Sequence, residues 1–365
     1  MGRKTRQIKI GGLAIGGDAP ISVQSMCSTD TRDVTATLSQ IVALEQAGCE
    51  IVRCAVPDLD AARALQQIRQ GCAIPLVADI HFDYRLALAA IDAGIDGLRI
   101  NPGNIGERWK VAEVVRACQE RQIPIRIGVN AGSLEKELLH KHGHATAAAM
   151  VESALGHIRL LEEESFEQIK ISLKASDIAR TVAAYRLLAQ QVDYPLHVGI
   201  TEAGTVFSGT IKSAIGLGVL LSEGIGATLR VSLTGDPVTE VRVGWEILKS
   251  LELRQRGPVF ISCPTCGRCR IDLIAIANEV EARLQDLPLP LKIAVMGCAV
   301  NGPGEAREAD LGIAGGNNEG ILFRRGELVC KVPQSDLADT LVAAAWQEVA
   351  ERQSAKNNNP GPSNG

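Results

Sequence analysis

Short apolar runs rich in valine, isoleucine and leucine recur along the first two thirds of the chain, and longer alanine- and leucine-rich stretches separate them. Short β-branched runs predict buried strands, whereas apolar residues three and four positions apart predict helices. The expected strands are Ile21–Met26, Ile51–Val56, Leu76–Ile80, Gly97–Ile100, Ile125–Val129, Ile169–Leu173, Leu196–Ile200 and Ala227–Leu233. The clearest helices, each followed closely by a glycine of the kind that ends helices, are Thr35–Gln46, Ala61–Arg69 and Arg85–Asp92.

Eight strands that alternate with helices predict a TIM barrel, the (β/α)8 fold, over residues 1–253. A doubly wound open sheet is the main alternative. It does not need eight strand–helix units, and its Gly-x-Gly-x-x-Gly phosphate loop does not follow the first strand here. We therefore expect an α/β protein whose first domain is a barrel.

The pattern changes after residue 253. Residues 254–258, Arg-Gln-Arg-Gly-Pro, have the composition of a linker, and residues 259–353 predict a smaller α+β domain. Its expected elements are strand Val259–Ser262, helix Arg270–Leu284, strand Lys292–Val295, strands near Asp310–Ala314 and Glu319–Phe323, and helix Ser335–Arg352. The polar residues 354–365 predict a disordered tail.

Composition narrows the class of protein. Hydrophobic residues make up 46% and charged residues 22%, as in ordinary globular proteins, and only 3% are aromatic, so the core is aliphatic, which suits parallel sheets. A net charge of -4 disfavours nucleic acid or an anionic membrane as a partner. The sequence shows no secretory signal and no membrane-spanning run, and its ten cysteines need no disulfides, so we expect a cytoplasmic protein.

Polar residues stand at the carboxyl ends of the expected barrel strands, where a TIM barrel keeps its active site. Four arginines and a lysine gathered there would repel one another, and a phosphate or diphosphate would relieve this, because arginine forks match phosphate oxygens. The alternative is a separate surface salt bridge for each arginine. Glu202 can handle a proton or act as a counter-ion, and His81 can donate or carry a proton. The candidate residues are Arg53, His81, Arg99, Asn101, Arg126, Asn130, Lys174, Thr201, Glu202, Arg230 and Ser232.

A group of cysteines lies in the second domain. Cys263 and Cys266 form Cys-x-x-Cys, Cys269 follows, and Cys298 lies in a segment rich in glycine. Thiolates at this spacing favour an iron–sulfur cluster. A zinc site with Cys269 as fourth ligand and a redox-active pair of Cys263 and Cys266 stay open as alternatives.

Six segments resemble, in order, the motifs of one enzyme family. They are Asp79-Ile80-His81-Phe82, Arg99-Ile100-Asn101-Pro102-Gly103-Asn104, Arg126-Ile127-Gly128-Val129-Asn130, Ile200-Thr201-Glu202-Ala203-Gly204, Ser262-Cys263-Pro264-Thr265-Cys266-Gly267-Arg268 and Asn301-Gly302-Pro303-Gly304-Glu305. On these motifs the chain resembles the 4-hydroxy-3-methylbut-2-enyl diphosphate synthase family, in its bacterial two-domain form, over nearly its whole length.

The resemblance implies one functional site in each domain. In that family a TIM barrel binds a cyclic diphosphate, and a second domain, similar to sulfite and nitrite reductase modules, carries one 4Fe–4S cluster per chain. The family's diphosphate contacts fall on the candidate barrel residues other than Glu202, and its acidic, proton-handling residue falls on Glu202. The implied cluster ligands are Cys263, Cys266, Cys298 and Glu305. Because a carboxylate is a harder ligand than a thiolate, we expect Glu305 to be the ligand that is most readily displaced from the cluster. Cys269 lies just beyond the family motif, and we expect it to be a bystander that does not bind the cluster.

The implied reaction is a two-electron reduction. It opens the ring of 2-C-methyl-D-erythritol 2,4-cyclodiphosphate and removes a hydroxyl as water, in the methylerythritol phosphate route to isoprenoids. The implied electron donor is reduced flavodoxin or ferredoxin, and the implied assembly is a head-to-tail homodimer. Two other classes stay open on the residues alone: a non-reductive pterin- or corrinoid-binding barrel with a zinc-stabilised appendage, and a dedicated electron carrier.

Overall fold

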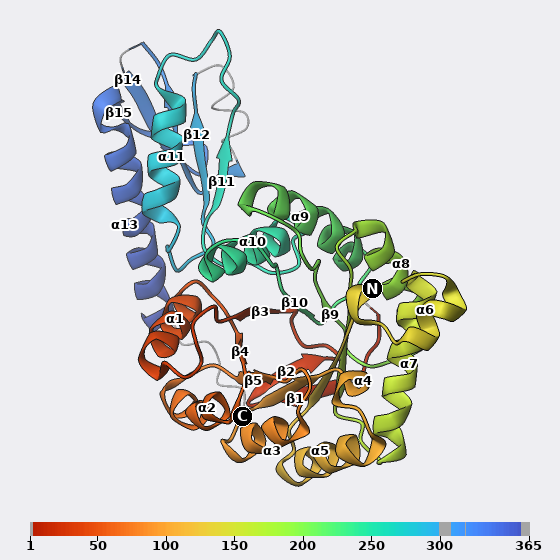
Figure 1. Cartoon of the computed structure of the whole chain (residues 1–365). Helices are drawn as coiled ribbons and strands as arrows, with labels where there is room; N and C mark the ends of the chain where they lie inside the picture. The colour runs from red at the N-terminus through yellow and green to blue at the C-terminus, as the bar shows by residue number, and fades with distance from the viewer. Residues whose placement is uncertain (1–2, 299–307, 318, 359–365) are drawn as a thin grey trace. The chain divides into compact units, whose positions relative to one another are not determined.

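The computed structural model describes residues 3–298, 308–317 and 319–358. The chain divides into two units, Met1–Arg254 and Gln255–Gly365, and each unit has its own hydrophobic core (Figure 1). The division falls inside the segment that the sequence predicts as a linker.

Eight parallel strands of the described residues form a nearly closed barrel in the first unit, which confirms the predicted TIM-like fold. The order of strands is β8-β7-β6-β5-β4-β3-β10-β9, and a parallel bridge from Ile171 to Leu196 joins the two ends of this sheet. The strands are β3 (Ser22–Met26), β4 (Ile51–Ala55), β5 (Leu76–Asp79), β6 (Gly97–Ile100), β7 (Ile125–Asn130), β8 (Ile169–Lys174), β9 (His197–Val198) and β10 (Thr228–Leu229). Each predicted run overlaps one of the strands, and β7 and β8 extend one residue beyond their predicted ends.

Helices surround the barrel strands (Figure 1). They are α1 (Val34–Gln46), α2 (Leu59–Gly71), α3 (Tyr84–Asp92), α4 (Pro102–Ile105), α5 (Arg108–Arg121), α6 (Lys136–His142), α7 (Ala147–Glu163), α8 (Ile178–Ala189), α9 (Val206–Ser222) and α10 (Pro237–Ser250), with a 3-10 turn η1 (Ala131–Ser133). An aspartate side chain accepts a backbone N–H at the start of several of them, for example Asp33, Asp58 and Asp177. Such caps satisfy N–H groups that the first turn leaves unpaired.

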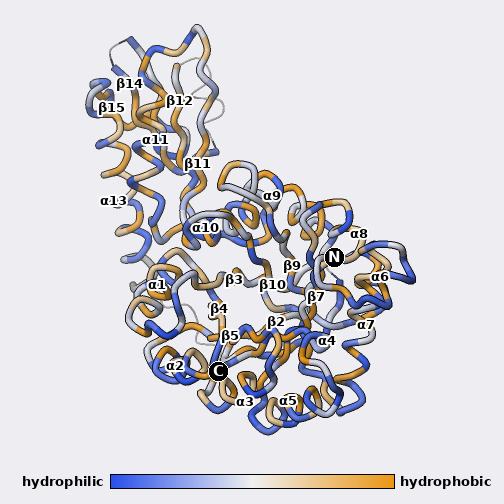
Figure 2. Tube along the Cα trace, viewed as in Figure 1, coloured by the Kyte–Doolittle hydropathy of each residue, from blue (hydrophilic) through white to orange (hydrophobic). Residues whose placement is uncertain are grey.

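Residues alternate in direction along each barrel strand, and β8 shows this clearly. Ile169, Ile171 and Leu173 belong to the core between the barrel and its helices. Lys170, Ser172 and Lys174 point to the opposite side, the barrel interior, and all three are buried. The inward face is therefore strongly polar, while Figure 2 shows mixed hydrophobic and hydrophilic positions along the surrounding helices.

A hairpin that the sequence analysis missed precedes the barrel. Strand β1 (Gln7–Ile10) pairs antiparallel with β2 (Leu13–Gly16), and its isoleucines pack on Ile51 and Val77, at the amino ends of β4 and β5. The hairpin thus closes the floor of the barrel. Its two short runs are separated by glycines, which obscures the alternation of apolar residues.

The second unit has a mixed five-stranded sheet among its described residues, in the order β11-β12-β13-β14-β15. The first three strands are parallel and the last two are added antiparallel. The strands are β11 (Val259–Ser262), β12 (Lys292–Met296), β13 (Leu311–Gly315), β14 (Glu319–Arg324) and β15 (Glu327–Pro333). The helices are α11 (Leu273–Leu284) and α13 (Leu337–Asn358), with a 3-10 turn η3 (Gln334–Asp336) before α13. Helix α13 includes residues 354–358, the start of the segment predicted as a tail; residues 359–365 lie outside the described residues.

Candidate active site

Five basic side chains gather in the barrel. Arg126, expected at a carboxyl strand end, is instead the second residue of β7. The five side chains come from five different strands or the residue that follows one: Arg53, Arg99, Arg126, Lys174 and Arg230. The first four are buried, and the side chain of Arg230 is 16% exposed. The structure therefore rejects the alternative of separate surface salt bridges for these arginines.

Asp79, at the end of β5, is the carboxylate that orders three of the predicted residues. Arg99 Nη1 donates to Asp79 Oδ1 at 2.9 Å, Arg53 Nε lies 3.5 Å from Oδ2, and His81 Nε2 lies 3.6 Å from Oδ2. Burial alone would raise the pKa of this carboxyl, but Arg53, His81 and Arg99 hold it well below its usual range. Asp79 therefore stays ionised and fixes its basic neighbours.

Glu240 of α10 plays the same part for Arg230. Its side chain accepts from Leu233 N at 2.8 Å, from Ser25 Oγ at 3.3 Å and from Arg230 Nη2 at 3.3 Å. This carboxylate is 4% exposed, so the Glu240–Arg230 ion pair is largely shielded from solvent. Neither Asp79 nor Glu240 was recognised from sequence as part of the site.

Several buried donors in the barrel lack a hydrogen-bond partner among the described residues. They include both Nε and Nη1 of Arg126, Nε of Arg99 and Nε of Arg230. Burial, followed by the charges of Arg53 and Arg99, lowers the pKa of Arg126 well below its usual range. Burial and the neighbouring Arg126 likewise lower the pKa of Lys174. Each unpaired buried donor costs about 1–3 kcal/mol, and an anion with several oxygens would satisfy them together.

The remaining predicted residues lie at the same strand ends with different exposure. His81 is exposed, and Asn130 ends β7 beside Lys174 of β8 in the strand register. The side chain of Asn101 is buried and caps α4, because its Oδ1 accepts Gly103 N at 3.1 Å. Thr201 and Ser232 are partly exposed beyond β9 and β10.

Glu202 differs from the other predicted residues of the barrel site in its backbone, in a conformation that it shares with Gln122, Ser165, Glu252 and Arg325. It is exposed after β9 and has a φ of 52°, in the left-handed region that residues other than glycine rarely adopt. Such strain costs about 1–3 kcal/mol and is retained mostly where function requires the geometry. The observation favours a functional role for Glu202 over that of a simple counter-ion.

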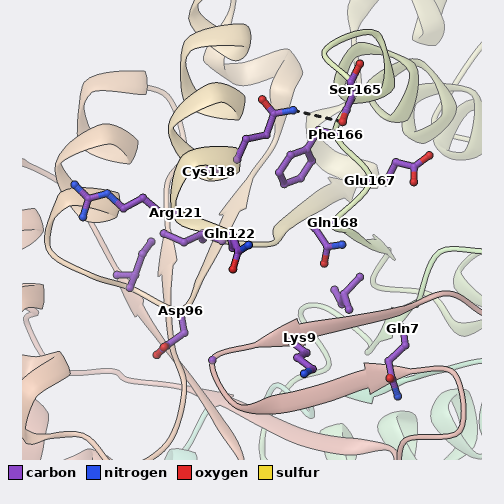
Figure 3. Close-up of a pocket in the computed structure, with 15 residues that line it drawn as sticks. Gln7, Lys9, Asp96, Cys118, Arg121, Gln122, Ser165, Phe166, Glu167 and Gln168 are labelled. Atoms are coloured by element: carbon purple, nitrogen blue, oxygen red, sulfur yellow. Dashed lines mark hydrogen bonds between the residues drawn. The ribbon is translucent and has the colours of Figure 1, made fainter.

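A separate pocket of about 800 Å³ lies at the opposite, amino end of the strands (Figure 3). Both of its acidic side chains are already paired: Asp96 Oδ2 lies 2.7 Å from Arg69 Nε, and Glu167 Oε1 lies 3.2 Å from Arg6 Nη1. It contains none of the predicted site residues. Because barrel enzymes carry out their chemistry at the carboxyl ends of the strands, the arginine-lined end is the better candidate.

The three predicted cysteine ligands follow strands of the second unit's sheet at the carboxyl ends of β11 and β12. Cys263 and Cys298 follow the neighbouring parallel strands β11 and β12, and Gly297 N donates to Cys263 Sγ at 3.3 Å. Cys266 is exposed, and hydrogen bonds from Arg268 lower the pKa of its thiol. Backbone N–H bonds and a ready thiolate are features of cysteines that hold iron–sulfur clusters.

Cys269 is placed differently from these cysteines. Its Sγ donates to Ile271 O at 3.3 Å, whereas Cys263 Sγ accepts a backbone N–H, although both cysteines pack against the core of the unit. The described cysteines are all free thiols, and the described residues contain no group of three or more His, Cys, Asp or Glu gathered closely enough to hold a metal. Glu305, the predicted fourth ligand, lies outside the described residues.

The two sites define a class of protein: a TIM-like barrel with a group of buried arginines, followed by a cysteine-bearing α+β unit. The GcpE TIM-barrel domain matches residues 5–245, and the GcpE protein C-terminal domain matches residues 259–347. The chain belongs to the GcpE family. This confirms the resemblance inferred from the motifs, and with it the expectation of an enzyme.

Curated relatives match along nearly the whole chain, and each is named 4-hydroxy-3-methylbut-2-en-1-yl diphosphate synthase (flavodoxin). The protein of Geobacter sulfurreducens is 70% identical over 352 residues, covering 96% of this chain and all of the relative. That of Symbiobacterium thermophilum is 61% identical and covers 96% of this chain and 94% of the relative. That of Maridesulfovibrio salexigens is 64% identical and covers 90% of this chain and 92% of the relative. Among the described helices, none has the length and apolar character needed to cross a membrane.

Proposed function

We propose that this chain reduces 2-C-methyl-D-erythritol 2,4-cyclodiphosphate to 4-hydroxy-3-methylbut-2-enyl diphosphate, as an enzyme of the methylerythritol phosphate route. The observation that carries the proposal is the set of buried basic side chains without a carboxylate partner, foremost Arg126 and Lys174. A diphosphate supplies the negative charge and the acceptor oxygens that these donors lack. The names of the relatives support the same substrate class.

The barrel residues bind and orient the substrate in this proposal. Arg126 and Lys174 contact the diphosphate, while Asp79 and Glu240 hold Arg53, Arg99 and Arg230 in place around it. The other contacts come from His81, Asn101, Asn130, Thr201 and Ser232. Fixed donors arranged before the ligand arrives lower the cost of reorganisation during the reaction.

Glu202 handles a proton in this proposal. The reaction takes up two electrons together with protons and releases water, so a group near the substrate must deliver a proton to the departing oxygen. A carboxyl at the rim of a basic pocket can hold and orient that proton. The strained backbone at Glu202 fixes the direction of its side chain.

The second unit, residues 259–353 in the proposed division, would hold one 4Fe–4S cluster per chain. Cys263, Cys266, Cys298 and Glu305 are its proposed ligands, and the soft thiol donors, the Gly297 N–H bond and the lowered pKa of Cys266 fit that group. When bound, such a cluster supplies single electrons at low potential. We further propose reduced flavodoxin or ferredoxin as the electron donor, a head-to-tail homodimer as the assembly, and the cytoplasm as the location.

Anaerobic turnover tests this proposal. The purified chain is expected to be brown, to contain about four irons and four sulfides, and to convert the cyclic diphosphate when a low-potential reductant is supplied. An active, colourless protein that contains zinc would contradict the cluster. Electron consumption that does not depend on the cyclic diphosphate would instead favour an electron carrier.

A further inference from the structure

One row of charged residues crosses four neighbouring strands of the barrel. The parallel register aligns Asp79 of β5 with Arg99 of β6, Arg99 with Arg126 of β7, and Arg126 with Lys170 of β8. All four side chains are buried. The row holds one negative charge, at the end farthest from Lys170, and three basic residues.

Lys170 is the member of this row without an assigned role. It precedes Lys174 by four residues on the same face of β8, so it lies about 13 Å deeper in the barrel. The hairpin residues Ile8 and Ile10 line the same small cavity as Lys170, which places the lysine near the closed floor. Lys170 therefore lies beside Arg126 at the level of the strand register and away from the mouth where a substrate enters.

No carboxylate of the described residues lies within ion-pair distance of Lys170. Asp79 is occupied by Arg53 and Arg99, and Glu240 is occupied by Arg230. The cavity that Lys170 shares with Gln24 and Arg126 has a volume of about 10 Å³, and the buried Gln24 Oε1 has no hydrogen-bond partner among the described residues. That space accommodates about one water molecule, so there is little room for solvent around Lys170.

The charged groups that act on Lys170 are positive: Arg126 on β7, followed by Arg53 on β4. His197 on β9 also faces Lys170, but burial and the neighbouring basic groups lower the pKa of this imidazole well below its usual range, so it adds no charge. Arg99 on β6 and Asp79 on β5 stand farther along the row, and Lys174 follows on β8. Burial, then Arg126 and Arg53, lowers the pKa of Lys170 well below its usual range. Because arginine does not lose its proton in proteins, the lysines are the groups that can relieve this crowding.

We propose that Lys170 is a positioning residue that takes up a proton from solvent when a diphosphate binds at the barrel mouth. The inference rests on the proposed function, since the diphosphate supplies the negative charge that makes a third positive charge in the row favourable. The protonated Lys170 then stabilises the bound anion through its electric field, from beside Arg126 and without touching the anion. The free barrel avoids the cost of burying a charged Lys170 next to Arg126.

Calorimetry measures this proton directly. The full cluster-containing chain is titrated with 2-C-methyl-D-erythritol 2,4-cyclodiphosphate at pH 8, without reductant, in two buffers of different ionisation enthalpy. The wild type is expected to take up protons on binding, and both Lys170→Met and Lys170→Arg are expected to take up about one fewer. Lys170→Arg keeps a permanent charge and so keeps its affinity, whereas Lys170→Met binds about tenfold more weakly. The exposed Lys212→Met is the matched control and behaves as the wild type.

Equal proton uptake in the wild type and in both Lys170 variants would overturn the inference and assign the proton to another group, such as Lys174. If neither variant folds, NMR of wild-type protein labelled at the lysine Cε carbons decides the question. One buried lysine is expected to be neutral when free and charged when bound; finding every lysine charged in both states overturns the inference. Binding without any uptake refutes Lys170 alone, whereas a failure to bind the cyclic diphosphate at all refutes the proposed function as well.

Discussion

Burial of Arg126 is energetically unfavourable unless a ligand accepts hydrogen bonds from its guanidinium group. Two of its nitrogens have no partner among the described residues, so the free protein bears the cost of burying them. We expect Arg126→Met to leave the free energy of unfolding unchanged or to raise it by about 1–3 kcal/mol. The same substitution should weaken binding of the cyclic diphosphate about 10- to 100-fold, because charge-assisted bonds to the anion are lost.

Denaturant unfolding and a binding titration check the two halves of this prediction. Arg63→Met is the control, because Arg63 is 75% exposed and pairs only with the exposed Asp60. It should change neither quantity. An Arg126 variant that unfolds more easily yet binds as tightly as the wild type would show that Arg126 is structural.

Glu202 allows strain and chemistry to be separated. Glu202→Gly relieves the left-handed backbone, so the free energy of unfolding should be no lower than that of the wild type. Glu202→Gln keeps the backbone and removes the ionisable group. Both variants should bind the cyclic diphosphate but lose at least about 100-fold in turnover, the usual range for removing a general acid. Near-normal turnover in Glu202→Gln would reduce this residue to a counter-ion.

Sequence predicted the basic residues of the barrel better than the groups that hold them. An arginine at a strand end is visible in a linear pattern, whereas Asp79 and Glu240 become site residues only through contacts that folding creates. The sequence does contain a signal for Lys170. It lies between two isoleucines, so it faces the same side of the strand as Lys174, and the isoleucines face the other side. That pattern also suits a solvent-facing strand, and only barrel closure turns it inward.

At the scale of elements, periodicity located all eight barrel strands because each is a short, buried aliphatic run. It missed β1, β2 and β15. Strand β15 is a largely exposed edge strand, so its sequence shows no apolar face. Strands β1 and β2 are short and are separated by two glycines, which hides their alternation of apolar residues. Strands that cover a core can be predicted from composition, but strands that cap or extend a sheet depend on contacts far away in the sequence.

The segment after β11 contains two proposed cluster ligands, Cys263 and Cys266, and also Cys269, which is not expected to bind the cluster. Cys298→Ser should lose the iron and sulfide, because a hydroxyl is a poor substitute for a thiolate at iron. Cys269→Ser should retain both, since its Sγ is directed to Ile271 O and the core. Metal and sulfide analysis of anaerobically purified variants measures this difference. Loss of iron in Cys269→Ser with full retention in Cys298→Ser would reverse the two assignments.

For the whole molecule, buried titratable groups should make stability depend on pH in two opposite ways. The pKa values of Lys170 and Lys174 are lowered in the folded barrel, so below about pH 10 the unfolded chain binds more protons and stability rises with pH. Burial raises the pKa of the Cys49 thiol to about 12 and that of Cys72 to about 11. Above about pH 9 the folded chain therefore binds more protons at these thiols, and stability falls.

The lysine contribution can therefore be isolated between pH 7 and 8, where the buried thiols stay mostly protonated in both states. Each lysine that changes protonation contributes up to about 1.4 kcal/mol per pH unit to the slope. Denaturant unfolding across this range should show a rise in the ligand-free wild type and a flatter dependence in a Lys170→Met, Lys174→Met double variant. Saturating cyclic diphosphate should also flatten the slope, because the bound anion keeps both lysines charged. A slope that neither the substitutions nor the ligand alter would mean that these lysines keep their protons in the folded barrel.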